Sequence, residues 1–216
     1  MKIGTTRVET FSDGVIAIII TIMVLALKLP DIEKVDTSQE IRYHLLHLLP
    51  YLGAYAFSFM MIGMFWTNHH HLFHLLEKTD SVLLWQNLLF LFWMSLIPLS
   101  TALIGANVLL SISVAVYGFV MLMTTLSFAI MRTYTLKKAL VHRDSDKMLS
   151  KAIKIVSVKA RTKSYIGTLA YLCSVPLAYV NVYYSFICFI IPPIIFFIPD
   201  GIDDEKLAQK VDEKNS

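Results

Sequence analysis

Charged residues are scarce in this chain: they make up 16% of it, against about 25% in a typical soluble domain. Apolar residues account for 56%, and the mean hydropathy is +0.62. The few charges gather at the two ends and in one internal block, so the stretches between carry almost none. This composition excludes a soluble globular protein and indicates, at 216 residues, one membrane domain.

Cysteine is equally sparse. The two cysteines, Cys173 and Cys188, both fall in apolar segments, and no CxxC or other cysteine-based metal spacing is present. We expect two separate thiols within the membrane rather than a disulfide.

Motifs that mark an enzyme or a familiar type of channel are also missing. The sequence has no TVGYG-type filter, no Walker loop, no HExxH, no GxSxG and no arginine ladder of the voltage-sensor type. No nucleophile–base pair or metal cage can be recognised, and no soluble domain large enough for an enzyme follows any span. We therefore predict neither enzymatic activity nor a cofactor, a resident metal or a nucleic-acid partner.

A helix needs roughly 20 mostly apolar residues to cross a bilayer, and six segments of this chain approach that length. We predict an all-α membrane protein in which residues 1–199 form one transmembrane domain. The first span is expected to be a true span and not a secretory signal, because it lacks a small-residue cleavage site and five more spans follow it. The predicted spans cover residues 11–29, 48–71, 83–103, 108–131, 165–180 and 184–198.

The basic residues set the expected orientation. Ten of the 19 lysines and arginines lie within residues 132–163, between the fourth and fifth spans. The positive-inside rule makes this segment a cytoplasmic loop, and an even number of spans then places both termini in the cytoplasm, including a short tail of residues 200–216. Residues 148–158 of the loop mix lysine with aliphatic side chains. We expect them either to lie on the membrane surface as a helix or to continue a spanning helix into the cytoplasm.

An ionisable residue inside a membrane is costly, so Asp13 near the start of the first span is a candidate functional residue. Glu9, four residues earlier, carries a like charge, and Arg7 lies on a different side of the helix. A partner from another helix or another subunit is therefore implied. The alternative is a plain acidic residue at a helix start, stabilised by the helix dipole.

A cluster rich in histidine ends the second span, at the membrane face where the first span is predicted to begin. His70 and His74 are four residues apart, a spacing that can hold a metal. No acidic residue lies within the histidine run, and Glu77 lies beyond it, so we favour hydrogen bonding to another helix. Histidines near an interface also permit sensitivity to pH. The cluster consists of Trp66, Asn68, His69, His70, His71 and His74.

The middle of the first span is almost uniformly apolar, and Thr21 is its only polar residue. Periodicity alone favours an ordinary lipid-facing or packed helix, in which Thr21 bonds back to its own backbone. One face of this helix, with Ile22 beside it, is expected to carry Phe11, Gly14, Ile18, Thr21, Leu25 and Lys28.

The polar start of the first span carries a family resemblance. Arg7, followed by Phe11, Ser12 and Asp13, matches the RxxxFSD signature that opens the first helix of the TMEM175 family. The apolar run after the signature also looks like that family's first helix. In outline the whole chain resembles one six-helix repeat, as in prokaryotic members, whereas the animal proteins carry two.

The resemblance implies a potassium channel with weak selectivity over sodium. It implies a homotetramer in the lipid bilayer of the cell membrane, with four copies of the first helix lining a central pore. Closure and selectivity are then expected from apolar side chains instead of a carbonyl filter. Carried over by position, the constriction residue is Ile18, the further apolar layers are Ile22 and Leu25, and Thr21 supplies a polar ring between them.

The resemblance also implies a hydrogen-bond network between the first two helices. The Trp66-x-x-His69-His70 stretch resembles the family's second-helix pattern, and a third consecutive histidine, His71, leaves its register open. The implied motif and network residues are Arg7, Phe11, Ser12, Asp13, Trp66 and either His69 or His70.

Two other functions fit the same sequence. A proton-coupled secondary transporter would use Asp13 and the second-helix histidines as a proton relay, with saturating flux and no unitary currents. A non-catalytic membrane scaffold would show no ion flux in liposomes.

Overall fold

The structure of the protein is a computed structural model that describes residues 4–26, 38–76, 78–138, 140 and 147–197. All regular elements in these ranges are helices, which confirms the predicted all-α class. In chain order they are α1 (Thr5–Met23), the short 3-10 helix η1 (Val24–Ala26), α2 (Ser38–His74), α3 (Ser81–Ser95), α4 (Ile97–Ala106), α5 (Ser111–Lys137), α6 (Lys147–Val180) and α7 (Val182–Phe197).

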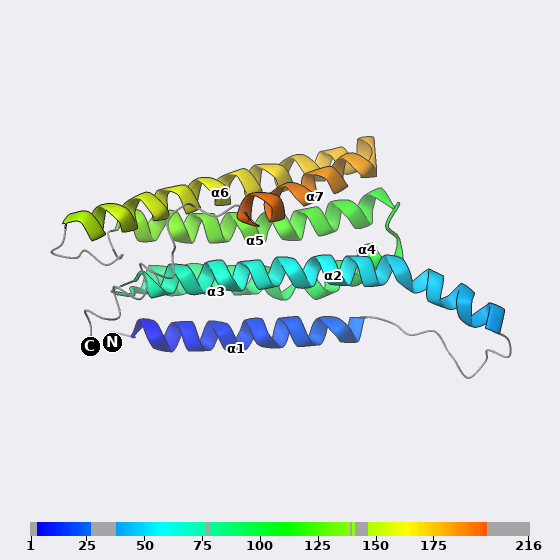
Figure 1. The fold of residues 1–216 in the computed structure, drawn as a ribbon, viewed down its shortest axis with the longest axis horizontal. Helices are drawn as coiled ribbons and strands as arrows, with labels where there is room; N and C mark the ends of the chain where they lie inside the picture. Colours follow the sequence, from blue (N-terminus) through cyan, green and yellow to red (C-terminus); the bar gives the residue numbers. More distant parts are fainter. Residues whose placement is uncertain (1–3, 27–37, 77, 139, 141–146, 198–216) are drawn as a thin grey trace.

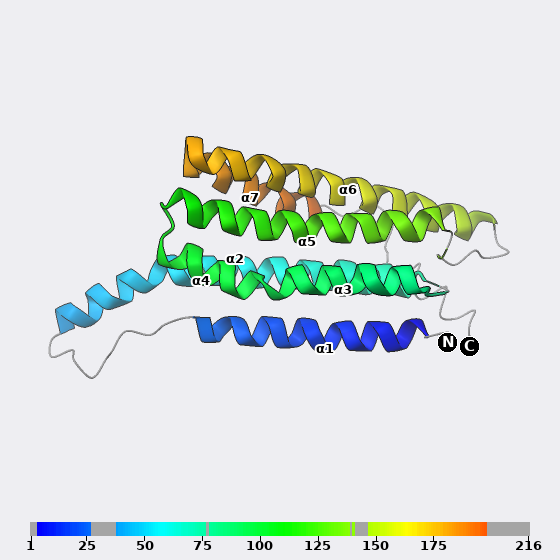
Figure 2. The ribbon, with the colours of Figure 1, turned by 180° about the vertical axis from the view of Figure 1, so that it is seen from behind.

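The helices lie side by side in one elongated bundle (Figure 1). α1 forms one edge, α2 and α3 lie next to it, α5 follows, and α6 with α7 forms the opposite edge. Figure 2 shows the same order from behind. Because α1 and α2 run in opposite directions, the polar start of α1 lies beside the histidine-rich end of α2.

A short break at Leu96 divides the third predicted span into α3 and α4. Pro98 lies in the first turn of α4 and has no backbone N–H, so the carbonyl four residues earlier loses its helical partner and the chain restarts as a new helix. The two pieces still run on as one apolar rod, Ser81–Ala106.

Within the described ranges, three helices are long and apolar enough to cross a membrane: Leu48–His74, Ser81–Ala106 and Ser111–Lys137. A shorter apolar helix covers Val182–Phe196. The predicted first span continues beyond Ala26 into residues outside the described part of the chain. The architecture is thus that of a helical membrane protein, and the number of six spans stays a prediction.

Two helices extend well beyond their predicted spans. α2 begins at Ser38 rather than near Leu48, and α6 begins at Lys147 rather than near Tyr165. α6 is unbroken, so its basic first half belongs to the same helix as the predicted fifth span. Much of the predicted loop 132–163 is therefore helical. Lysine and arginine are good helix formers, so low hydropathy marks the end of a span but not the end of a helix.

α5 lies at the centre of the bundle, with α3 and α6 packed against it. Tyr117 and Phe128 are among its largest buried side chains. The α5–α6 contact is close: a Cβ atom added to Gly118 would come within 2.7 Å of the Ser174 hydroxyl oxygen. Small residues at such contacts are typical of helix packing in membranes.

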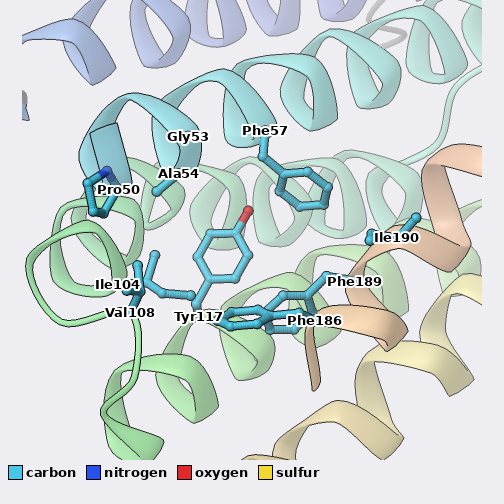
Figure 3. Close-up of a pocket in the computed structure, with 10 residues that line it drawn as sticks. All are labelled: Pro50, Gly53, Ala54, Phe57, Ile104, Val108, Tyr117, Phe186, Phe189 and Ile190. Carbon is cyan, nitrogen blue, oxygen red and sulfur yellow. The ribbon is translucent and has the colours of Figure 1, made fainter. Parts of the chain in front are cut away.

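An apolar cavity of about 320 Å³ lies between α2, α4, α5 and α7, away from the start of α1 (Figure 3). The Tyr117 hydroxyl is the only polar side-chain atom among the residues that line it, and this hydroxyl lies 3.0 Å from the Ser58 hydroxyl. Thr101 in turn donates to Ser58 at 2.7 Å. An ion that loses water in this cavity would find no free oxygen ligand there.

Candidate functional site

α1 has two unlike faces because it lies at the edge of the bundle. One face packs against α2, α3 and α4, and the opposite face is not covered by any helix in the described ranges. Side chains three and four residues apart share a helix face, so the division follows from the helical period. The buried face consists of Val8, Ser12, Ile16, Ile19 and Met23.

The open face of α1 carries the residues that the resemblance assigns to the pore. Ile18 is 57% exposed, Ile22 is 49% exposed and Leu25 is 77% exposed. Phe11 and Thr21 are exposed on the same side, whereas Lys28 lies outside the described residues. So much open apolar surface needs lipid or another protein surface to cover it.

Thr21 is the polar exception on this face. Its hydroxyl donates to the backbone carbonyl oxygens of Ala17 and Ile18, each at 3.0 Å. This is the back-bonding expected of threonine in a helix. Since the hydrogen is used within the helix, the lone pairs of the hydroxyl oxygen remain available to a cation on the exposed side.

A buried hydrogen-bond chain ties the start of α1 to α3 and α2. Ser12 donates to the Val8 carbonyl at 2.9 Å and accepts from Asn87 Nδ2 at 2.8 Å. Asn87 Oδ1 lies 2.9 Å from His69 Nε2, which therefore carries the proton in this arrangement. All three side chains are buried, and buried polar groups are stable only when paired. The chain thus holds the buried face of α1 in one position.

His69 is also held by aromatic rings. It stacks on Phe73 with ring centroids 4.3 Å apart, and on Phe90 at 5.8 Å. Of the two histidines that the motif leaves open, His69 is therefore the one that meets Ser12, through Asn87.

Asp13 has a partner from the second helix: Trp66 Nε1 donates to Asp13 Oδ1 at 2.9 Å. α1 begins at Thr5 after the N-cap Gly4, so Asp13 lies more than two turns inside the helix. The dipole of a helix acts mainly on its first turn, and the alternative of a plain helix-start acid is therefore wrong.

Arg7 and Phe11 do not join these contacts within one chain. Both side chains are exposed, and among the described residues Arg7 has no side-chain hydrogen bond or ion pair. Both are therefore available for contacts outside a single subunit.

Glu9 approaches two histidines of α2. Its Oε1 atom lies 3.0 Å from His70 Nδ1, and one ligand atom from each of Glu9, His70 and His74 lies within 4.8 Å of the others. The acidic residue that the histidine run itself lacks is thus supplied by another helix. Glu9 is remote from them in the chain, and only the packing of α1 on α2 brings it there.

Two residues at this end of the bundle were not predicted from the sequence. Asn87 bridges α1 and α2. Its signal was an amide, next to Gln86, in an otherwise apolar stretch, where such a group is costly unless paired. Arg132, assigned only to the basic segment, is buried and lies 4.8 Å from the centre of the Phe128 ring. Its guanidinium donates to Ser164 Oγ and to the Asn68 carbonyl, each at 3.3 Å, which links α5 to α6 and α2.

Comparison with known proteins assigns this chain to a family. The sequence model of the family described as endosomal/lysosomal potassium channel TMEM175 matches residues 7–98. This range contains Asp13, Trp66 and Asn87. A potassium channel of Chryseobacterium sp. (strain P1-3) is 34% identical over 203 residues, which cover 94% of this chain and 97% of that protein. The chain belongs to the TMEM175 family.

Further similarities to TMEM175 proteins extend over most of the chain. A potassium channel of Chamaesiphon minutus (strain ATCC 27169 / PCC 6605) is 34% identical over 192 residues, 87% of this chain and 91% of that protein. The crystal structure of a lysosomal potassium-selective channel TMEM175 homolog from Chamaesiphon minutus matches with a TM-score of 0.73 at 27% identity. That match covers 88% of this chain and 95% of the other. The prediction of a prokaryotic TMEM175 protein is confirmed.

Proposed function

We propose that the protein is a subunit of an ion channel, and not an enzyme, that conducts potassium across the cell membrane with weak selectivity over sodium. The two bacterial relatives that match most of the chain are named potassium channels, and the similar solved structure is described as potassium-selective. The observation that carries the proposal is the open face of α1, an apolar surface with one hydroxyl, positioned by a buried polar chain on the other face.

The open face of α1 supports a pore that lies between subunits. In a homotetramer, four copies of this face directed inwards would cover one another's apolar surface and enclose a central path. Arg7 is exposed near the start of α1, where it would meet a neighbouring subunit. Its positive charge suits a carboxylate such as Asp13 of another copy.

The apolar residues of α1 would form the constriction. Rings of Ile18, Ile22 and Leu25 would narrow the pore at three levels, and Ile18 would be the first of them after Asp13. An apolar ring excludes a hydrated ion and can gate by losing its water. Such a neck takes the place of the carbonyl filter that the sequence lacks.

Thr21 would supply the polar ring between the apolar levels. Four hydroxyl oxygens around the axis can replace part of the water of a partly dehydrated cation. This ring offers fewer oxygen atoms than a carbonyl filter does. It should therefore discriminate potassium from sodium less sharply, in keeping with weak selectivity.

The basic residues support a cytoplasmic position for the end of the bundle where α1 begins. Lys137 and Lys138 close α5 at this end, and Lys147 opens α6. The positive-inside rule places such residues in the cytoplasm. With α3 and α4 counted as one span, six crossings would leave both termini on that side.

The proton-coupled transporter is less well supported. Asp13, His69 and His70 all lie at one end of the bundle, and the described part of α1 beyond Asp13 carries no titratable side chain. A relay through the membrane needs proton-accepting groups along its whole path.

Ion flux into proteoliposomes, with potassium and sodium compared under the same conditions, tests the channel. We expect potassium flux to exceed sodium flux and unitary currents to appear in planar bilayers. Flux that saturates without unitary currents would identify a transporter, and no flux of either ion would identify a scaffold. Both results would overturn the proposal.

Assembly is tested separately with Asp13→Asn. The amide can still accept from Trp66, but it has no charge to attract an arginine of a neighbouring subunit. We expect fewer tetramers on native gels. A fully stable tetramer would show that the Asp13 charge is not needed for assembly.

A further inference from the structure

Three metal-ligating side chains meet at the end of the bundle where α1 begins: Glu9 on α1, and His70 and His74 on α2. One ligand atom of each lies within 4.8 Å of the other two, and Glu9 Oε1 is 3.0 Å from His70 Nδ1. Neither the open face of α1 nor the buried chain around Ser12 uses any of these groups.

The helical period presents the two histidines side by side. His70 and His74 are four residues apart, and their ring centroids are 4.3 Å apart. The same spacing on one helix face supplies two of the zinc ligands in HExxH motifs. No loop has to rearrange to form this half of the cluster, because the helix itself sets the spacing.

Glu9 is brought to the pair by contacts that do not involve it. Asp13, one turn further along α1, is bonded to Trp66 at 2.9 Å. Ser12 accepts from Asn87 at 2.8 Å on the buried face. These two bonds fix both the position of α1 along its axis and its rotation relative to α2 and α3. The third ligand is therefore held in place independently of its own contact with histidine.

The contact between Glu9 and His70 has the distance of an ion pair but leaves one imidazole nitrogen without a hydrogen bond. His70 Nδ1 is shielded from solvent and, within the part of the chain that the structure describes, makes no hydrogen bond of acceptable geometry, although Glu9 Oε1 is only 3.0 Å away. A shielded nitrogen without a hydrogen bond is uncommon in proteins. A bound cation would use the lone pair of this nitrogen.

The geometry points to a binding site for a divalent transition-metal ion of the zinc class, with Glu9, His70 and His74 as its ligands. Two imidazole nitrogens and one carboxylate oxygen, with water in the fourth position, form a known zinc donor set. Imidazole ligands favour zinc, copper or nickel over magnesium and calcium. His74 is exposed and His70 is partly exposed, so an ion can enter from solvent.

The cluster is slightly wider than a filled site. Bonds of about 2.0–2.2 Å to zinc place neighbouring ligand atoms roughly 3.4 Å apart in a tetrahedron. The Glu9–His70 distance of 3.0 Å is slightly shorter than this, and a separation at the 4.8 Å limit of the cluster would have to shrink by roughly 1.4 Å. Of the three ligands, His74 has the most room to adjust, because it is exposed whereas Glu9 and His70 are partly buried.

A bound ion would join α1 to α2 beside the bond between Asp13 and Trp66. The ion would therefore favour one position of α1, the helix that carries the proposed pore face. The size of this effect is set by the difference in ion affinity between the positions that α1 can take. The site goes beyond the proposed function, because metal binding can be measured whether or not the protein conducts ions.

Zinc binding to the purified full-length protein in detergent, without a polyhistidine tag, tests the site. The protein is stripped with EDTA, dialysed and titrated with zinc chloride in a calorimeter, and Co²⁺ absorption in the visible range gives a second readout. We expect one ion per chain. Loss of even an outer-shell partner costs about 10- to 100-fold in metal affinity, so Glu9→Gln and His74→Gln should each weaken zinc binding at least about tenfold.

His71→Gln is the matched control, because His71 is adjacent in sequence but lies outside the three-ligand cluster. It should bind zinc as tightly as the wild type. Absence of zinc binding, wild-type affinity in both ligand variants, or an equal loss in His71→Gln would each overturn the proposal.

Thermal unfolding separates loss of the site from loss of the fold. Zinc should raise the midpoint of the wild type more than that of His74→Gln at the same zinc concentration, while the two proteins unfold together without zinc. Because His74 is exposed, this variant decides the question even if Glu9→Gln fails to fold.

Discussion

The indole nitrogen of Trp66 in α2 donates a 2.9 Å hydrogen bond to Oδ1 of Asp13 in α1. This bond joins the two sequence segments that carry the family resemblance. It also fixes the rotation of α1, and that rotation decides which residues reach the open face. A charged acceptor makes such a bond stronger than one between neutral groups.

Trp66→Phe keeps an aromatic ring but removes the donor to Asp13. Hydrogen bonds to charged groups contribute about 1.5–3 kcal/mol, and water will replace part of this one because Trp66 is exposed. We expect a loss of about 1 kcal/mol in unfolding free energy, measured by thermal or denaturant unfolding in detergent. Trp85→Phe is the matched control, since Trp85 is an exposed tryptophan whose indole nitrogen has no hydrogen bond to the described residues. Equal losses in the two variants would contradict the assigned role of the bond.

Asn87 carries a larger share of the stability because both of its partners are buried. Asn87→Leu leaves His69 Nε2 without a partner and removes the bond that Ser12 Oγ accepts, although Ser12 still donates to the Val8 carbonyl. The unsatisfied buried nitrogen costs about 1–3 kcal/mol, and the lost hydrogen bond costs about 1 kcal/mol more. We expect a loss of about 2–4 kcal/mol, while Leu88→Ala at the exposed neighbouring position should change stability by no more than about 0.5 kcal/mol. A double-mutant cycle of Asn87→Ala with Ser12→Ala should show coupling, and strict additivity would indicate that the bond between them is not significant.

The open face of α1 was predicted through the family resemblance, which assigns Ile18, Thr21 and Leu25 to it. Periodicity alone could not select this face, because an almost uniformly apolar helix does not show which of its faces is special. The contacts of the buried face could not be predicted. The approach of Glu9 to His70 depends on which helices pack together and at what rotation. The spacing of residues along one helix predicts neither.

Helix ends were predicted less well than helix cores. Hydropathy located the apolar half of α6 near Tyr165 but not its start at Lys147, because a helix can leave the membrane without ending. The break at Leu96 was missed for the opposite reason: α3 and α4 are equally apolar, and only Pro98 marks the interruption.

Two isoleucines on opposite faces of α1 should respond differently to the same substitution. Ile16 is buried, so Ile16→Ala should cost about 2–5 kcal/mol of stability. Ile18 is exposed, so Ile18→Ala should change subunit stability by no more than about 0.5 kcal/mol. Both Ile18→Ala and Ile18→Asn should instead raise the leak conductance, because a smaller or polar ring keeps the neck wet. Unchanged current in both variants would rule out Ile18 as the neck.

Asp80, which precedes α3, links the start of that helix to the end of α5. It accepts from the Leu83 N–H at 2.8 Å and from the Tyr134 hydroxyl. Desolvation alone would raise the pKa of this carboxyl, but the two hydrogen bonds and the charge of Lys138 outweigh it and hold the pKa below its usual value. An acid with a lowered folded-state pKa stabilises the fold above its unfolded pKa of about 3.9, and this contribution is lost as the pH falls.

Asp80→Ala should therefore cost about 0.5–2 kcal/mol near neutral pH, the usual effect of losing an N-cap. The difference from the wild type should narrow between about pH 5 and pH 3, as the carboxyl becomes protonated. Tyr134→Phe removes one of the two bonds and should give a smaller difference with the same pH trend. Unfolding curves over this range provide the measurement, and a difference independent of pH would exclude a role for the Asp80 charge.

Thr21 should set the preference for potassium while leaving the subunit intact. Thr21→Val keeps the branched shape and removes the hydroxyl oxygen, whereas Thr21→Ser keeps the oxygen and removes the methyl group. A tenfold permeability ratio corresponds to about 1.4 kcal/mol, so four hydroxyls need contribute only about 0.35 kcal/mol each to produce it. We expect the reversal potential between potassium and sodium solutions to move towards zero in Thr21→Val and to stay near the wild-type value in Thr21→Ser. If both variants keep the wild-type value, selectivity arises elsewhere along α1, and the apolar rings at Ile22 and Leu25 become the next positions to test.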